Sequence, residues 1–439
     1  MSSLPPLRVG LLGLGTVGGG TIAVLRRNAE VISRRVGRSI EVVAASARDI
    51  SKPRAFDLSG IELYADPAEL VLQPQVDVVL ELIGGTTVAK DLVLLALENG
   101  KHVVTANKAL IALHGNEIFE VAQRTDTVVA FEAAVAGGIP VIKAAREALA
   151  GNRIEWLAGI INGTCNFILT AMSEPGCEFE TVLAEAQALG YAEADPAFDI
   201  DGIDAAHKLT ILAAIAFGVP LQFERVYVEG IRHISRADVE YAERLGYRIK
   251  HLGMARQVAD GIQLRVHPTL IPVSQLLANV DGVMNAVMLH SDAAGSTLYY
   301  GAGAGAEPTA SAVVSDLVDV ARTGDADRVN RVPPLAFQTG SLSELPIVSM
   351  DAVETAYYLR LHVLDQPGVV ADVTRILGAS DISIEAILQQ ESEHGAATVP
   401  IIILVHPVVE HAMNQALAEI EALPQVHEPV IKIRMESLA

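Results

Sequence analysis

Residues 190–208 contain the densest set of titratable side chains in an otherwise apolar part of the chain. Five acids and one lysine fall here: Glu193, Asp195, Asp199, Asp201, Asp204 and Lys208. Asp204 and Lys208 are four residues apart, so they share one face of a helix. An apolar segment rarely concentrates this many acids without a cationic ligand. We therefore expect a binding site for such a ligand here, the alternative being a helix cap with a surface ion pair.

A second lysine, Lys108, follows the predicted strand 102–105 in the stretch Val104-Thr105-Ala106-Asn107-Lys108. Parallel sheets place their ligands at the carboxyl ends of the strands. A cation at this edge can polarise a substrate oxygen. Taken alone, Lys108 is better explained as a surface residue near the start of a helix.

Three glycines, Gly13, Gly15 and Gly18, follow an apolar strand and open a helix. This spacing is typical of a dinucleotide-binding turn, in which backbone amides and the helix N-terminus face a pyrophosphate. Thr16 and Val17 complete the turn. The next strand ends in Arg48 and Asp49; the arginine suits the 2′-phosphate of NADP and the acid suits NAD, so the choice stays open.

Two further stretches interrupt apolar runs. Residues 131–140 end a strand in Gly137-Gly138, where Glu132 and backbone carbonyls can hold a hard monovalent cation, although a plain strand-to-helix turn explains the pattern more simply. Cys165, within Ile161–Asn166, is a candidate nucleophile of a thioester-forming aldehyde dehydrogenase. The favoured interpretation is a small buried residue.

The elements that position these residues alternate along the N-terminal part. Strands are expected at 7–12, 40–46, 76–83, 102–105 and 127–131, with helices from the glycine turn to about 28 and at 90–99 and 111–124. Apolar strands alternating with helices predict an α/β fold with a Rossmann-type doubly wound parallel sheet. After residue 140 longer helices and fewer strands are expected, the strands near 223–229 and 261–268. A helix at 309–322 is expected to pack back on the first domain.

The C-terminal part has a different pattern. Residues 325–346 are rich in Pro, Ser, Gly and charge and indicate a linker. Strand, helix, strand, strand, helix and strand then follow at 356–363, 369–377, 382–389, 398–405, 410–422 and 430–435. This βαββαβ order is the ferredoxin-like plan. The turn at 364–369, with Asp365 and Gly368, presents free amides at a helix start, which suits an amino-acid carboxylate.

Composition excludes several classes of protein. The net charge of −21 argues against a nucleic-acid partner. No apolar run has membrane-spanning length without interruption, and the N-terminus lacks a signal-peptide pattern. The two cysteines, Cys165 and Cys177, indicate free thiols of a reducing, cytoplasmic compartment.

Taken in order, the motifs resemble homoserine dehydrogenase over essentially the whole chain. The resemblance is carried by GLLGLGTVG, VVLELIGG, VVTANKAL, FEAAVAGGIP, INGTCNFIL, LGYAEADPAFDIDGIDAAHK and GAGAGAEPTASAVVSD. The C-terminal unit looks like an ACT domain, a module that commonly binds amino acids. The resemblance implies NAD(P)H-dependent interconversion of L-aspartate 4-semialdehyde and L-homoserine, in threonine, methionine and isoleucine biosynthesis, with threonine as effector.

It also implies roles for residues. Lys208 matches the acid–base residue, with Asp204 beside it, and Lys108 lies by the nicotinamide. The residues that match substrate-binding positions are Gly190, Glu193, Asp199, Asp204 and Lys208. Those that match dinucleotide-binding positions are Gly13, Gly15, Thr16, Val17, Gly18, Arg48, Thr86, Thr105, Lys108 and Gly305. A sodium site is matched by Glu132, Val135, Gly137 and Ile139, and the effector positions by Asp365 and Gly368.

The expected organisation is a dinucleotide-binding domain at 1–139, an α/β catalytic and dimerisation domain at 140–324, a linker at 325–350 and an ACT domain at 351–439. A homodimer or homotetramer is expected. The enzymatic rival is an aspartate-semialdehyde dehydrogenase that uses Cys165. A rival of another class is a non-catalytic dinucleotide sensor, against which the acid-rich segment before Lys208 argues.

Overall fold

The structure is a computed structural model, and it describes residues 4–174, 177–323, 326, 331–389 and 398–438. The chain forms two compact units. The first comprises Met1–Gly163, Asp204–Val226 and Met284–Leu345, and the second Thr164–Ile203, Tyr227–Val283 and Pro346–Ala439. Of the expected linker, residues 325 and 327–330 lie outside the described part of the chain.

A six-stranded parallel sheet forms the core of the first unit, in the order β3-β2-β1-β4-β5-β6. Its strands are β1 (Leu7–Leu12), β2 (Ile40–Ser46), β3 (Glu62–Tyr64), β4 (Val78–Glu81), β5 (His102–Thr105) and β6 (Val129–Ala130). Most of their apolar side chains are buried, as a sheet covered on both faces requires. The order is that of the doubly wound fold and reverses between β1 and β4, which confirms the predicted architecture.

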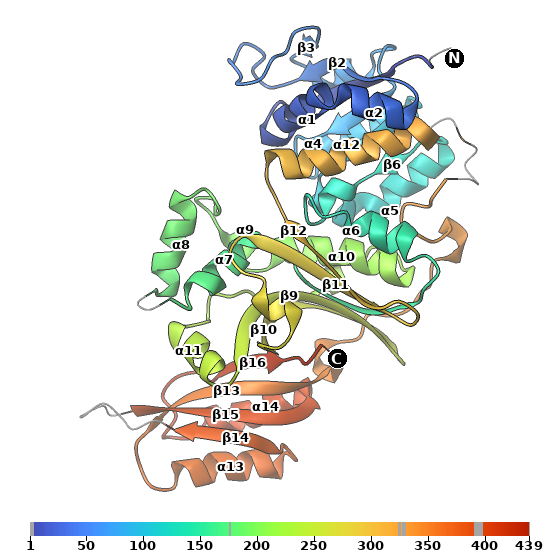
Figure 1. Ribbon diagram of the computed structural model, residues 1–439. Helices are drawn as coiled ribbons and strands as arrows, with labels where there is room; N and C mark the ends of the chain where they lie inside the picture. Colours follow the sequence, from blue (N-terminus) through green and yellow to red (C-terminus); the bar gives the residue numbers. More distant parts are fainter. Residues whose placement is uncertain (1–3, 175–176, 324–325, 327–330, 390–397, 439) are drawn as a thin grey trace. The chain divides into compact units, whose positions relative to one another are not determined.

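Helices connect these strands and cover the sheet (Figure 1). They are α1 (Thr16–Arg27), α2 (Ala29–Val36), α3 (Pro67–Val71), α4 (Val88–Glu98) and α5 (Lys108–Arg124). A later helix, α12 (Ala306–Thr323), packs beside α1 and shares its hydrophobic core. The approach is close, because a Cβ on Gly20 would lie 2.5 Å from the Ala306 carbonyl oxygen. Helix α12 therefore contributes to the core of the first unit.

The rest of the first unit carries three antiparallel strands, in which β11 (Met284–Ser291) pairs with both β7 (Ile154–Ile160) and β12 (Gly295–Ala302). Helix α10 (Ile203–Phe217) is buried along nearly its whole length. A short helix α6 (Val141–Lys143) continues into a π-helical turn, Ala144–Ala148.

The second unit contains a long antiparallel hairpin of β9 (Tyr247–Val258) and β10 (Gly261–Pro272). Its helices are α7 (Gly163–Ala171), α8 (Phe179–Ala188), α9 (Ala197–Ile200) and α11 (Arg236–Arg244). The strand expected at 223–229 is wrong in extent: Phe223–Arg225 is a 3-10 turn and only Tyr227–Val228 (β8) pairs, with β10. The expectation of few strands after residue 140 is also wrong, since β7, β9, β11 and β12 were not predicted.

The C-terminal elements follow the predicted βαββαβ plan. They are β13 (Glu354–Leu364), α13 (Val369–Ala379), β14 (Ile384–Gln389), β15 (Thr398–Val409), α14 (Glu410–Glu421) and β16 (Ile431–Met435). β13 lies between β15 and β16, and β14 pairs with β15. β16 also pairs in parallel with β10, through Thr269 and Leu270. The ferredoxin-like unit therefore continues the sheet of the β9–β10 hairpin.

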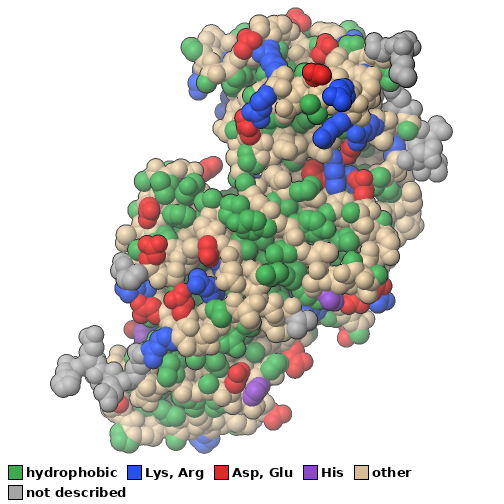
Figure 2. Space-filling model, viewed as in Figure 1, with side chains coloured by type: hydrophobic (Ala, Val, Ile, Leu, Met, Phe, Trp, Pro, Cys, Tyr) green, Lys and Arg blue, Asp and Glu red, His purple; other side chains and the backbone are tan. Residues whose placement is uncertain are grey.

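Basic side chains gather over part of the first unit despite the acidic net charge, as Figure 2 shows. Four of them, Arg26, Arg27, Arg34 and Arg35, lie exposed in the last turns of α1 and α2. Cations at helix C-termini complement the helix dipole. Among the described residues, no helix combines the length and apolarity needed to cross a bilayer.

Candidate active site

Two lysines and one carboxylate meet inside the first unit. Asp204 lies in the first turn of α10; its Oδ2 is 2.7 Å from Lys208 Nζ one turn later and its Oδ1 is 3.1 Å from Lys108 Nζ. The exposed fraction is 5% for the Asp204 side chain, 11% for Lys208 and 33% for Lys108. The i, i+4 pair predicted from sequence is confirmed, and the fold adds Lys108 to it.

Two further groups orient this cluster. Lys208 Nζ donates a hydrogen bond of 2.6 Å to the Ile161 carbonyl, and Asn162 Nδ2 donates one of 2.8 Å to Asp204 Oδ2. Both come from the residues that follow β7. The ammonium of Lys208 is therefore aimed by one carbonyl and one carboxylate.

The electrostatics of the cluster keep Asp204 ionised. Burial would raise the pKa of Asp204, but the charges of Lys208 and Lys108 outweigh it and hold that pKa well below its usual range. His207, next to Lys208 in sequence, is stacked on Phe223, and burial lowers its pKa to about 4. One carboxylate thus faces two cations beside a neutral imidazole, leaving the cluster with a net positive charge.

The ends of β4 and β5 place Lys108. Thr105 donates 2.6 Å to Glu81 Oε2 and accepts from the Asn107 amide at 2.9 Å. The Asn107 side chain accepts from the Leu110 amide and so caps α5. These bonds start α5 at the carboxyl edge of the sheet, with Lys108 in its first turn.

The glycine turn lies at the switch point between β1 and β4. Gly13 has φ +102°, and a Cβ there would lie 2.7 Å from the Leu82 carbonyl oxygen; a Cβ on Gly18 would lie 2.1 Å from that of Gly13. By contrast, nothing lies within 4 Å of a Cβ built on Gly15. Gly13 and Gly18 are therefore required by the fold, whereas Gly15 leaves open space where a pyrophosphate can approach the start of α1.

The end of β2 carries the residues that distinguish the two dinucleotides. Asp49 accepts from both the hydroxyl and the amide of Ser51, at 2.6 and 2.9 Å, which holds its pKa below the usual value. Arg48 is exposed. The other expected contacts, Thr86 after β4 and Gly305 before α12, are half-buried and exposed loop residues of the first unit.

The remaining predicted substrate residues belong to the second unit. Gly190 and Glu193 lie exposed between α8 and α9, and Gln187 bonds the Glu193 carbonyl at 3.0 Å. Asp199, on α9, accepts from Thr164 Oγ1 at 3.2 Å. Gly190, Glu193 and Asp199 thus lie in a structured segment of the second unit.

The expected cation site is a tight turn of the first unit. The Glu132 carboxylate accepts the amides of Ile142 and Lys143, at 3.0 and 2.9 Å, so it caps the start of α6. Burial, aided by Asp316, raises the pKa of Glu132 to about 7. The described residues contain no cluster of three His, Cys, Asp or Glu side chains suited to a metal ion. Any cation at this turn must rely chiefly on the backbone carbonyls.

Cys165 is fully buried, and its Sγ donates to the Asp199 carbonyl at 3.3 Å. Neither Cys165 nor Cys177 forms a disulfide. The interpretation of Cys165 as a small buried residue fits this environment, and a nucleophile would need access to substrate.

Four functional groups of the cluster escaped the sequence analysis: Asn162, the Ile161 carbonyl, His207 and Glu81. The first two lie in the polar interruption around Cys165, which was the available signal. Glu81 ends a strand that reads as apolar, and nothing in the sequence shows that its carboxylate is buried against Thr105.

In the C-terminal part, Asp365 and Gly368 are exposed in the turn before α13. Gly368 is the N-cap, with φ +98°, and no described side chain caps the helix in its place. The free amides expected at this turn are consistent with that geometry.

The class of protein follows from two of these arrangements. A glycine turn at the switch point of a doubly wound sheet binds a dinucleotide. A lysine cluster at the carboxyl edge of the same sheet can neutralise the oxygen on which hydride transfer leaves negative charge. The chain is an α/β oxidoreductase of the NAD(P)-dependent class.

Comparisons with known proteins identify the family. Residues 13–132 match the NAD-binding domain of homoserine dehydrogenase, residues 140–318 homoserine dehydrogenase, and residues 357–425 the ACT domain. The chain is 61% identical over 435 residues to homoserine dehydrogenase of Pseudomonas aeruginosa, covering 99% of this chain and 100% of that protein. It therefore belongs to the homoserine dehydrogenase family.

Solved structures agree with this assignment. A homoserine dehydrogenase from Thiobacillus denitrificans is 61% identical, with a TM-score of 0.94 over 99% of both chains. A hyperthermophilic archaeal homoserine dehydrogenase in complex with NADPH is 28% identical, with a TM-score of 0.62, covering 72% of this chain and 97% of that one.

Proposed function

We propose that the chain catalyses the reversible reduction of L-aspartate 4-semialdehyde to L-homoserine, with Lys208 as the acid–base residue. The observation that carries the proposal is the buried contact of Lys208 with Asp204 and the Ile161 carbonyl. A lysine held in this way is able to donate a proton near the carboxyl edge of the sheet, which supports the proposal.

Lys208, Asp204 and Lys108 have different roles in the proposed reaction. When bound, the dinucleotide supplies or accepts the hydride. In the reductive direction Lys208 donates a proton to the oxygen of the aldehyde, which becomes the hydroxyl of homoserine. Asp204 stays ionised throughout and keeps Lys208 and Lys108 in place, while the charge of Lys108 stabilises the developing alkoxide. The substrate ammonium requires an acid other than Asp204, and the family resemblance implies Glu193 for this role.

NADP is the dinucleotide that we expect the chain to prefer. The Asp49 carboxylate is engaged by Ser51, whereas the guanidinium of Arg48 is exposed at the end of β2. A 2′-phosphate requires such a cation. The archaeal relative solved with NADPH supports the same choice.

We also infer a sodium ion at the Glu132–Ile139 turn. Ala136 and Gly137 both have positive φ, 53° and 48°, which bends the backbone sharply within the expected site. The candidate ligands are the carbonyl oxygens of Val135, Gly137 and Ile139, with Glu132 beside them. Initial rates in sodium against equal concentrations of choline test this inference; unchanged rates would refute it.

Threonine is the effector that we propose for the ACT domain, bound through the turn of Asp365 and Gly368. The test is Asp365→Ala in the full-length enzyme, which should weaken threonine inhibition at least tenfold while leaving uninhibited turnover intact. Removing the whole domain is a poorer test, because β16 pairs with β10. The cytoplasmic location and the homodimer or homotetramer stay predictions.

The decisive experiment compares two buried lysines. Lys208→Met should reduce kcat for homoserine oxidation by about 100-fold or more. Lys101→Met is the matched control, because Lys101 is also buried and bonds a backbone carbonyl, that of Gln73, away from the cluster. Equal activity in the two variants would show that Lys208 is not the acid–base residue. If the unaltered protein reduced neither NADP⁺ nor NAD⁺ with homoserine, the proposed function itself would be refuted.

A further inference from the structure

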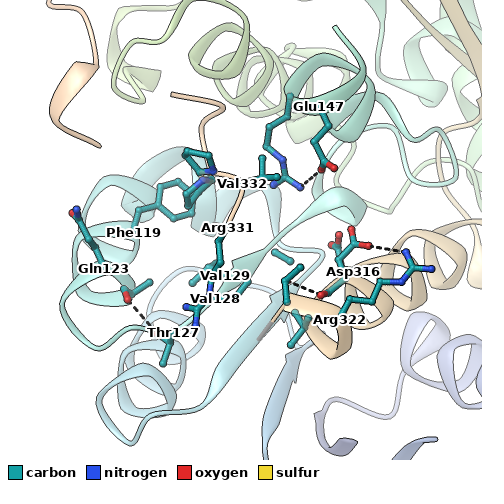
Figure 3. A pocket seen from close by; sticks show the side chains of 18 of the residues that line it. Phe119, Gln123, Thr127, Val128, Val129, Glu147, Asp316, Arg322, Arg331 and Val332 are labelled. Atoms are coloured by element: carbon teal, nitrogen blue, oxygen red, sulfur yellow. Dashed lines mark hydrogen bonds and ion pairs between the residues drawn. The ribbon is translucent and has the colours of Figure 1, made fainter. Parts of the chain in front are cut away.

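A cavity of about 360 Å³ lies in the first unit, and none of its lining residues has been assigned a role above. One of them, Asp316, accepts a hydrogen bond from the Glu132 amide at 2.8 Å. It is formed by the end of α5, strand β6, the π-helical turn after α6, helix α12 and residues 331–338 (Figure 3). Its volume is in the range of small-molecule sites. Neither the dinucleotide turn nor the lysine cluster contributes to its lining.

One side of the cavity is apolar. Phe119 and Ala122 of α5, Val128 before β6 and Val320 of α12 line it, with Pro333 and Pro334 at the rim. Figure 3 shows Phe119 on the side away from Asp316. This surface suits a hydrocarbon or aromatic side chain rather than a sugar or a phosphate.

The charged residues in the lining of the cavity balance one another. Three arginines and three acids line it: Arg146, Arg322, Arg331, Glu147, Asp316 and Asp319. They form pairs, Arg146 with Glu147 at 2.8 Å and Arg322 with Asp319 at 3.7 Å, while Lys143 Nζ lies 3.7 Å from Asp316 and 2.5 Å from Asp319. A ligand with one positive and one negative group leaves this balance undisturbed, whereas a simple anion or cation does not.

Arg146 has donor capacity left over. Its side chain is only 10% exposed and forms an ion pair with Glu147. Its Nε is buried and has no hydrogen-bond partner within the part of the chain described here. Buried guanidinium donors are normally satisfied, so an unmet one beside a cavity indicates a missing acceptor.

We propose that this cavity binds a free α-amino acid with an apolar side chain. Its carboxylate would meet Arg146, its ammonium would meet the carboxylates on α12, and its side chain would lie against Phe119 and Val128. The site is separate from the ACT domain and does not depend on the proposed catalytic function, since binding itself is the readout.

The test is calorimetric titration of the full-length protein with L-leucine and L-phenylalanine. The deaminated analogues 4-methylpentanoate and 3-phenylpropionate are titrated in parallel. We expect saturable binding of at least one amino acid, and at least tenfold weaker binding of its deaminated analogue because the ammonium contact is lost. No saturable heat overturns the proposal, and equal affinity for the deaminated acid overturns it in favour of a carboxylate site.

Two variants locate the binding. Arg146→Met removes the charge and keeps the apolar stem, and Val332→Trp fills the rim at a position that is 46% exposed, so it should leave the fold intact. Each should weaken binding at least tenfold. Val31→Trp, at a 49% exposed valine of α2, is the matched control and should bind normally. Binding that survives Val332→Trp, or is lost in Asp365→Ala instead, overturns the assignment.

Discussion

Arg434 donates to both carboxylate oxygens of Glu410, at 2.9 and 2.6 Å, with no exposure of the arginine side chain. It also donates to Glu229 at 2.6 Å. Glu410 opens α14 of the ACT domain, and Glu229 follows β8. Burial raises the pKa of Glu410, but the charge and hydrogen bonds of Arg434 outweigh it and lower that pKa overall.

Arg434→Met should therefore destabilise the protein strongly, because the buried Glu410 and the half-buried Glu229 lose their shared cation. Breaking a buried pair costs about 3–5 kcal/mol. The measurement is equilibrium unfolding in urea. The double variant with Glu410→Gln should regain part of this loss; a double variant no more stable than Arg434→Met would contradict the argument.

Gly15→Ala and Gly18→Ala should separate dinucleotide binding from folding. The Gly15 change should weaken NADP⁺ binding at least tenfold without lowering Tm, since an added methyl meets open space. The Gly18 change should lower the free energy of unfolding by about 1–3 kcal/mol, because the added methyl collides with the Gly13 carbonyl. Fluorescence titration and thermal unfolding measure the two effects. Normal NADP⁺ affinity in Gly15→Ala would contradict our interpretation of the turn.

Arg48→Ala should raise KM for NADP⁺ at least tenfold and leave KM for NAD⁺ nearly unchanged, because only NADP carries the 2′-phosphate. Lys52→Ala, another exposed cation of the same loop, is the control. Initial rates with both dinucleotides decide; equal effects on the two would show that Arg48 does not distinguish them.

Asp204→Asn should lower kcat by about 100-fold while the protein stays folded, because the isosteric amide keeps the packing but removes the charge between Lys108 and Lys208. Asp201→Asn is the matched control on an exposed acid, which pairs with Arg232. Turnover in Asp204→Asn close to that of Asp201→Asn would mean that the charge is not needed.

Asp316→Asn should flatten the pH dependence of stability between about pH 4 and 6. Burial raises the pKa of Asp316 to about 6 against a reference value of 3.8, despite Lys143 and Arg146 nearby. The folded state then binds the proton more tightly than the unfolded state, so stability falls as pH rises through this window. The asparagine variant lacks this loss, on the order of 2 kcal/mol. Urea unfolding at pH 4.5 and at pH 7 measures the difference in stability between the two pH values. If this difference were the same in Asp316→Asn as in the unaltered protein, the raised pKa of Asp316 would be contradicted. Any pH dependence that remains in the variant is expected from Glu132.

The sequence predicts the dinucleotide-binding sheet well because its strands are short apolar runs bounded by glycine and polar residues. β2 and β5 have the predicted limits. β9 escaped prediction because Lys250 and His251 break its apolar character. In the fold Lys250 is buried, and its ammonium donates hydrogen bonds to the Val280 carbonyl and to Asp281. Only the tertiary structure brings these two acceptors to the lysine.

The same distinction applies to the site. The pair of Asp204 and Lys208 is local to one helix turn, so spacing alone predicts it. The contact of Lys108 with Asp204 joins helices far apart in sequence and depends on the fold. Asp49 shows the limit in the other direction: its type suits a ribose hydroxyl, yet its carboxylate is occupied by Ser51.

The position of β16 between β10 and β13 has a consequence for synthesis on the ribosome. β10 and β13 are made first, and each keeps one edge without this partner until residues 431–435 emerge. Unpaired strand edges invite pairing with other chains. The nascent chain is therefore prone to aggregation until β16 is inserted between β10 and β13. Chaperone protection during this interval should matter more for this chain than for an enzyme whose regulatory domain folds independently.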